Sequence, residues 1–203
     1  MPILTITLLT DGSSDRVLLP LINFLLDELS PTPHRVIFAE GLHSGSLVSR
    51  LESALDLYPC DLLLIHRDSE TLSSEDRQDE IKRAESAVQG LPHSIHIIPV
   101  RMTETWLLID QQAIRRAAGN PSGNQPLGIP AVKTLEGLPN PKAVLFNALT
   151  TAKNLGSRRR RQFRPESLRH RVAELIEDPS RLRSLVSFKH FESQVAEYFA
   201  TRT

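Results

Sequence analysis

The chain has 203 residues, of which 40% are hydrophobic and 24% charged, and this is the composition of a globular protein with one sizeable core. Basic and acidic residues balance at 24 each, so the net charge gives no general attraction to nucleic acid. The single cysteine excludes an internal disulfide and a zinc site built from several cysteines. Asp11 interrupts the first apolar run, and no later run approaches the roughly 20 residues that span a bilayer, so we expect a soluble, cytoplasmic protein.

Strand-like and helix-like segments alternate over the first 119 residues. Apolar segments rich in β-branched residues predict strands at residues 3–9, 35–39, 61–66 and 94–100. Each is followed by a segment with helical spacing of apolar residues or a capping residue, at residues 15–29, 46–57, 75–88 and 103–118. This alternation predicts an α/β fold, with a mainly parallel, Rossmann-like central sheet and helices on both faces.

The composition changes after Gly119. Residues 120–141 are rich in proline and glycine, so we expect a long loop there. A basic loop is expected at residues 153–164, and helical segments are expected at residues 142–152, 165–176, 179–186 and 188–199. The sequence therefore predicts a core at residues 1–119 and a helical extension at residues 120–203 that packs on it.

Acidic residues follow three of the four predicted strands. Asp11 follows the first strand, with Asp15 one helical turn beyond it, while Asp68 and Glu70 follow the third strand and Glu104 the fourth. Because the carboxyl ends of parallel strands lie along one edge of a sheet, these side chains can meet there. Clustered carboxylates repel one another unless a cation lies between them, and hard cations such as Mg²⁺ take oxygen ligands. The pattern therefore predicts a divalent metal site.

Four short motifs carry a resemblance to a known family. TDGSSDRVLLPLI, at residues 10–22, resembles the first motif of Toprim-fold proteins in the form seen in OLD-type nucleases. IHRDSE, at residues 65–70, resembles their DxD motif. Two later motifs follow in order, PVRMTETWLLID at residues 99–110 and LPNPKAVLF at residues 138–146. This order is closer still to that of a bacterial family of Toprim-like proteins of the DUF4276 type. The resemblance extends from Ile3 to about Leu149 and depends on the order and spacing of the motifs.

The resemblance implies a Toprim-like fold and a nuclease that uses Mg²⁺ or Mn²⁺ to cleave DNA or RNA, in phage defence or DNA repair. The resemblance implies that Asp11 transfers the proton and that Asp68 and Glu70 bind the metal, with Asp15 as a further metal ligand. Glu104 matches the acid of the family's ExW segment and is grouped with the catalytic residues. This chain departs from the family twice, since Asp11 replaces a glutamate that is one methylene longer and Glu70 replaces an aspartate.

A basic stretch supplies a candidate surface for nucleic acid. A nuclease needs positively charged side chains that contact the phosphate backbone, and a run of arginines is suited to that contact. The candidate residues are Lys153, Arg158, Arg159, Arg160, Arg161 and Arg164. A charge run of this kind is equally typical of a solvated surface, and both interpretations stay open.

Structural interpretations exist for the acids as well. Asp68 and Glu70 could simply solvate a strand end, and Asp15 and Glu104 could complement helix dipoles. His66 is interpreted as a packed or rim residue rather than a ligand. The alternative function is a non-catalytic, Toprim-like partner of a separately encoded ATPase or defence complex, and phosphoryl transfer on a small molecule is a third possibility.

Overall fold

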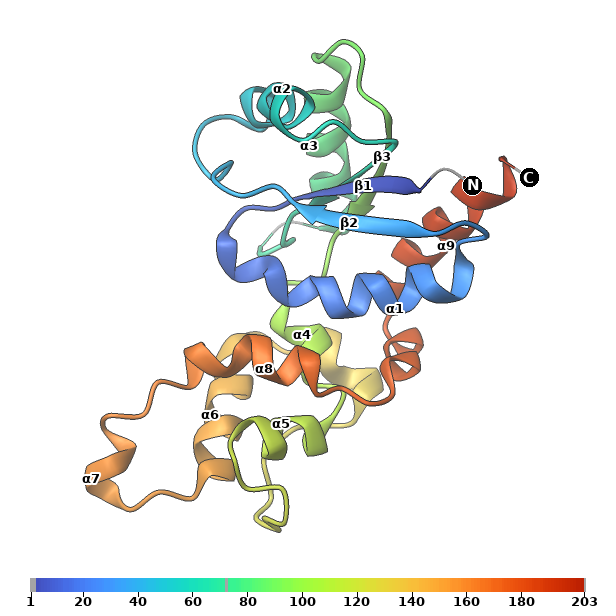
Figure 1. Cartoon of the computed structure of the whole chain (residues 1–203). Helices are drawn as coiled ribbons and strands as arrows, with labels where there is room; N and C mark the ends of the chain where they lie inside the picture. Colours follow the sequence, from blue (N-terminus) through green and yellow to red (C-terminus); the bar gives the residue numbers. More distant parts are fainter. Residues whose placement is uncertain (1–2, 72, 203) are drawn as a thin grey trace.

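The structure, a computed structural model, describes residues 3–71 and 73–202 and contains a four-stranded parallel sheet. The strands are β1 (Leu4–Leu9), β2 (His34–Phe38), β3 (Leu62–His66) and β4 (His93–Ile97). Their order across the sheet is β2-β1-β3-β4, so β1 and β3 are central (Figure 1). The registers that pair Ile6 with Leu62 and Leu62 with His93 bring the carboxyl ends of the strands to one edge. The predicted α/β class is confirmed.

Helices cover both faces of this sheet. On one face lie α1 (Leu19–Leu29) and α9 (Val186–Ala200), and on the other lie α2 (Leu47–Leu57) and α3 (Ser74–Ser86) (Figure 1). All five residues of β3 are buried, and they alternate between the two layers. Leu62 and Leu64 pack with α1 and α9, whereas Leu63 and Ile65 pack with α2 and α3. This period of two explains why the strand is apolar throughout.

The chain after β4 forms a helical lobe beside the sheet (Figure 1). Its helices are α4 (Glu104–Leu107), α5 (Gln111–Ala117), α6 (Pro141–Lys153), α7 (Ser157–Arg160) and α8 (Arg169–Glu174). The lobe also contains the short 3₁₀ helices η2 (Val132–Gly137), η3 (Pro165–Leu168) and η4 (Pro179–Ser184). A further 3₁₀ helix, η1 (Ser13–Leu18), lies between β1 and α1. The predicted C-terminal helical extension is confirmed, and α9 returns from it to pack against β4 and α1.

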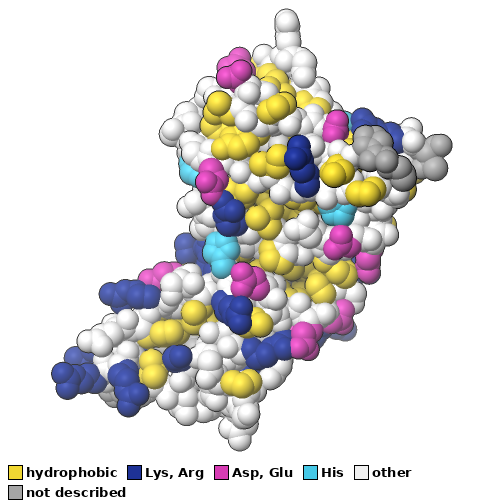
Figure 2. Space-filling view, viewed as in Figure 1, with side chains coloured by type: hydrophobic (Ala, Val, Ile, Leu, Met, Phe, Trp, Pro, Cys, Tyr) yellow, Lys and Arg dark blue, Asp and Glu magenta, His cyan; other side chains and the backbone are white. Residues whose placement is uncertain are grey.

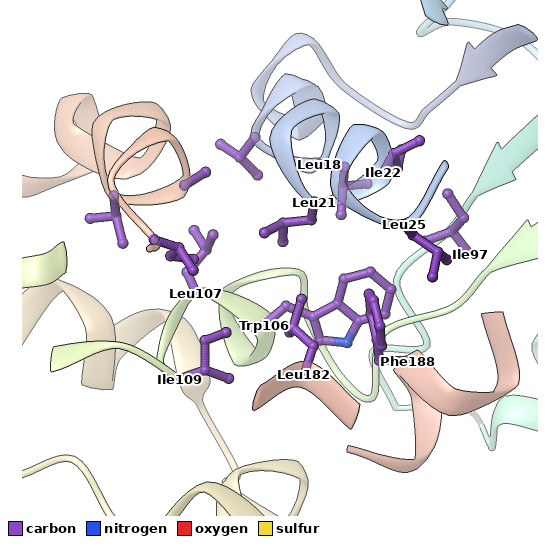
Figure 3. Packing of buried hydrophobic residues seen from close by; sticks show 14 of the residues in the cluster. Leu18, Leu21, Ile22, Leu25, Ile97, Trp106, Leu107, Ile109, Leu182 and Phe188 are labelled. Carbon is purple, nitrogen blue, oxygen red and sulfur yellow. The ribbon is translucent and has the colours of Figure 1, made fainter. Parts of the chain in front are cut away.

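Trp106 joins the lobe to the sheet. Its fully buried ring lies 5.2 Å from the Phe188 ring of α9, edge to face, and its indole N–H donates to Ser187 at 2.9 Å. Figure 3 shows it among side chains of α1, β4 and α9, including Leu25 and Ile97. One continuous core therefore runs from the sheet into the lobe, which fixes the lobe beside the sheet edge.

Several predicted elements differ in detail. The helix expected at residues 103–118 is two helices, because Asp110 accepts hydrogen bonds from the N–H groups of Gln112 and Ala113, at 2.8 and 3.0 Å, and caps α5. The helix expected from Asp15 begins as the 3₁₀ helix η1, since Pro20 lies in the first turn of α1. The expected loops contain η2 and α7.

The domain boundary after Gly119 stays a prediction. Across it, α5 packs against α6 and α8, and α9 packs against β4. Among the described residues, no helix is long and apolar enough to cross a membrane.

Candidate functional site

The loops that follow β3 and β4 continue side by side beyond the sheet. The N–H of Arg67 donates to the carbonyl of Ile97 at 3.1 Å, and that of Ser69 donates to Pro99 at 3.2 Å. Farther on, the N–H of Glu70 donates to Arg101, whose own N–H donates to the Ser69 hydroxyl at 2.7 Å. These bonds hold both loops in place at the carboxyl edge, next to the end of β1.

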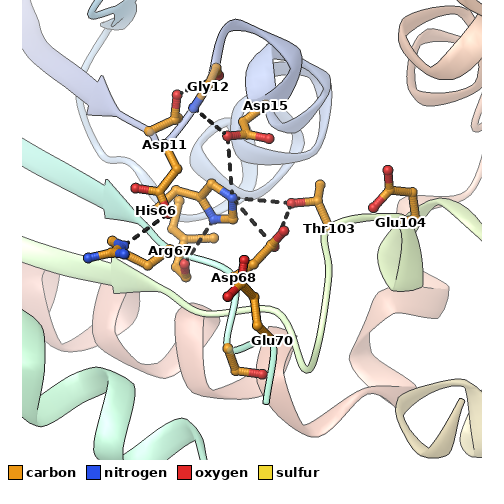
Figure 4. Close-up of polar contacts among 12 residues, drawn as sticks. Asp11, Gly12, Asp15, His66, Arg67, Asp68, Glu70, Thr103 and Glu104 are labelled. Atoms are coloured by element: carbon orange, nitrogen blue, oxygen red, sulfur yellow. Dashed lines mark hydrogen bonds and ion pairs between the residues drawn. The ribbon is translucent and has the colours of Figure 1, made fainter. Parts of the chain in front are cut away.

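Asp15 and Asp68 both approach His66 at this edge (Figure 4). Nε2 of His66 lies 3.8 Å from Oδ2 of Asp15 and 3.6 Å from Oδ1 of Asp68. The Asp15 carboxylate is placed by the N–H of Gly12, which donates to it at 3.0 Å across the start of η1. Two carboxylates from separate segments therefore share one buried corner.

His66, interpreted from the sequence as a packed or rim residue, is packed and is the most deeply placed of the group. Its side chain is 1% exposed, and Nδ1 lies 3.1 Å from the carbonyl of Ile97. Because a carbonyl can only accept a hydrogen bond, Nδ1 is the donor in this contact, and Nε2 faces the carboxylates. The one signal in the sequence was a polar ring at the end of an otherwise apolar strand.

The charge in this corner is poorly compensated. The pKa of Asp68 is raised to about 6, chiefly by burial and also by the nearby charges of Asp15 and Glu104, while His66 and the Thr103 hydroxyl act in the opposite direction. A carboxyl group with a raised pKa is typical of a site that binds a cation or exchanges a proton.

The structure places Asp11 differently from the prediction. Its two oxygens accept hydrogen bonds from Arg50 and Arg67, each at 2.9 Å. Arg50 is buried and also donates to the carbonyls of Thr10 and Leu42. In Figure 4 the Asp11 carboxylate is directed at Arg67 and away from Asp68. Its contacts are those of a residue that holds the end of β1 to α2 and β3.

In Figure 4, Glu70 lies beyond Asp68, and Glu104 lies beyond Thr103. The backbone of Glu70 adopts the left-handed conformation, with φ of 53°, and its side chain is 66% exposed, 3.9 Å from Arg77. Glu104 is buried and forms an ion pair with Arg169, which also donates to the carbonyl of Ser14 at 3.2 Å. Neither side chain reaches between Asp15 and Asp68.

The donor set suits Mg²⁺ only in part. No group of three or more His, Cys, Asp or Glu side chains among the described residues is arranged to hold a metal ion. Mg²⁺, however, usually keeps several waters and binds through one or two carboxylates together with substrate phosphates. Asp15 and Asp68 fit that requirement, whereas Asp11 and Glu70, in their present contacts, do not.

The predicted basic residues lie at the far end of the helical lobe. Arg158 to Arg161 and Arg164 are exposed around α7, and Lys153, at the end of α6, is half-buried. Figure 2 shows Lys and Arg side chains gathered on this end of the molecule. Within the part of the chain that the structure describes, none of these arginines forms an ion pair, although eight other arginines do. Their charges are therefore available to a polyanion.

Comparisons of the chain with protein-family models, with curated proteins and with solved structures find no match.

Proposed function

We propose that this protein is a nuclease that uses Mg²⁺ or Mn²⁺, held by Asp15 and Asp68, to hydrolyse phosphodiester bonds of DNA or RNA. The supporting observation is the approach of these two carboxylates to the same nitrogen of His66, at 3.8 and 3.6 Å. The raised pKa of Asp68 marks a place where a divalent cation would remove an electrostatic cost. The motif order that resembles Toprim-fold nucleases favours the same function.

The chemistry of a bound divalent ion is to lower the pKa of a coordinated water and to neutralise charge on the phosphate. The protein's own part is to present oxygen ligands at the right separation and to exclude water around them. Burial of Asp15, His66 and Thr103 supplies a dry wall on one side, and the partly exposed side chain of Asp68 supplies the open side. A phosphate would approach from the open side.

The basic cluster around α7 would hold the rest of the substrate. Arginines pair with phosphate oxygens through two parallel N–H donors, and among the described residues no acidic side chain forms an ion pair with these arginines. They lie on the lobe rather than beside the acids (Figure 1), which favours a long nucleic acid over a small phosphate ester as substrate.

A cleavage assay tests the proposal. Purified protein is incubated with plasmid and with single strands in Mg²⁺ or Mn²⁺, beside the variants Asp15→Ala and Asp68→Ala. Asp56→Ala is the matched control, because Asp56 is an exposed carboxylate near the end of α2. We expect cleavage by the wild type and by the control only. Equal background cleavage by wild type and Asp68→Ala would contradict the proposal.

One observation favours a second function, that of a non-catalytic subunit beside a separately encoded ATPase in a defence complex. Both oxygens of Asp11, the residue expected to transfer a proton, are held by arginines. In that case a stable complex with an ATPase encoded beside this chain would form, and Asp68→Ala would leave the activity of the complex intact. Loss of that activity in Asp68→Ala would exclude the non-catalytic subunit.

A further inference from the structure

Thr103 is the only hydroxyl that contacts both Asp68 and His66 in the described part of the chain. The residue is 3% exposed. Its Oγ1 donates to Oδ1 of Asp68 at 3.0 Å and lies 3.2 Å from Nε2 of His66. Figure 4 shows the hydroxyl directed at both side chains. One oxygen of Asp68 is thereby fixed, and the other makes no hydrogen bond within the described residues.

The position of Thr103 in the chain would ordinarily give its hydroxyl another task. Thr103 is the N-cap residue of α4, where a threonine side chain commonly accepts a hydrogen bond from a backbone N–H of the first turn. Here it makes no such bond. The helix start therefore forgoes its side-chain cap, and the hydroxyl is directed to Asp68 instead.

The contact is anchored at its other end by the sheet. His66 is held through Nδ1 by the carbonyl of Ile97, and Ser69 binds the N–H of Arg101 in the adjoining loop. A continuous set of contacts thus runs from β4 through His66 and Thr103 to Asp68. Such a set restricts the rotation of the Asp68 carboxylate, because each member is itself immobilised.

We infer that Thr103 is a positioning residue that fixes the orientation of the Asp68 carboxylate at the site proposed for the cation shared with Asp15. The inference rests on the proposed metal-dependent function. It assigns Thr103 no contact with substrate. Groups that orient a metal's ligands typically change metal affinity by about 10- to 100-fold when they are removed.

Calorimetric titration with Mn²⁺ alone tests this role without depending on cleavage. Thr103→Val and Thr103→Ala remove the hydroxyl, the second without adding a methyl group beside Asp68, and Thr103→Ser keeps it. Thr105→Val is the matched control, because Thr105 is also fully buried but its hydroxyl donates to the carbonyl of Val100 at 3.1 Å. Thermal unfolding and circular dichroism of each variant report folding.

We expect Mn²⁺ affinity to fall by about 10-fold or more in Thr103→Val and Thr103→Ala. Thr103→Ser and Thr105→Val should bind as the wild type does. Wild-type affinity in either folded variant that lacks the hydroxyl would overturn the inference while leaving the proposed function in place. Absence of Mn²⁺ binding by the wild type would overturn both, so the two failures are distinguishable.

Discussion

Arg169 on α8 forms an ion pair with Glu104 on α4, within the helical lobe. The two side chains are 12% and 4% exposed. The same guanidinium donates to the carbonyl of Ser14, the residue before Asp15. A contact made within the lobe therefore extends to the segment that places one of the two proposed metal ligands.

Removal of this arginine should destabilise the protein strongly. Arg169→Ala leaves the Glu104 carboxylate buried without its partner, and we expect a loss of about 3–5 kcal/mol in the free energy of unfolding. Arg171→Ala is the control on the same helix, since its pair with Glu174 is more than half exposed, and it should cost about 1 kcal/mol or less. Urea unfolding measures both free energies. Equal losses of unfolding free energy in the two variants would contradict the prediction that the buried Arg169–Glu104 pair matters more than the exposed one.

The raised pKa of Asp68 predicts that Asp68→Asn stabilises the protein in a pH-dependent way when a chelator keeps divalent metal ions away. The native pKa of about 6 exceeds the ordinary value of 3.8, so the native state binds this proton more tightly than the unfolded chain does. Ionisation therefore costs stability above pH 6, and the cost disappears as the pH falls below about 4. Since asparagine cannot ionise, the variant should be more stable than wild type by about 2–4 kcal/mol at pH 7.5 and should match it near pH 4. A variant no more stable than wild type at pH 7.5 would contradict this.

The basic cluster predicts how nucleic-acid binding depends on salt. Each phosphate contact contributes about 0.9 to the slope of log affinity against log salt for duplex DNA. Replacement of Arg158, Arg159, Arg160 and Arg161 by glutamine should therefore lower that slope by up to roughly 3.6. The double variant Arg83→Gln and Arg181→Gln removes exposed charge elsewhere and should leave the slope unchanged. Fluorescence anisotropy of a labelled duplex, measured across salt concentrations, gives both slopes.

The sheet and the meeting of Asp15 with Asp68 follow from local patterns. Strand β3 is a run of apolar residues that ends in charge, and a parallel sheet brings such ends to one edge. The Gly12–Asp15 contact is also local, spanning three residues. The strand, its charged end and the Gly12–Asp15 contact are predictable because neighbouring residues determine them, and the rule for parallel strands then brings the two segments to one edge.

The contacts of the other acids could not be read from the sequence. Asp11 is held by Arg50, 39 residues away, and Glu104 by Arg169, 65 residues away. Such pairs depend on how whole helices pack, which no local pattern encodes. The role of Thr103 was hidden for a related reason, because a threonine at a helix start ordinarily indicates a cap.

The most direct test of the central claim is a calorimetric titration of the wild type with Mn²⁺, repeated with Asp15→Asn, Asp68→Asn and the control Asp56→Asn. We predict binding by the wild type and the control, and its loss in both Asp15→Asn and Asp68→Asn, because each removes one of the two carboxylates that approach Nε2 of His66. Undiminished Mn²⁺ binding by the folded Asp15→Asn and Asp68→Asn variants would contradict the assignment of the site.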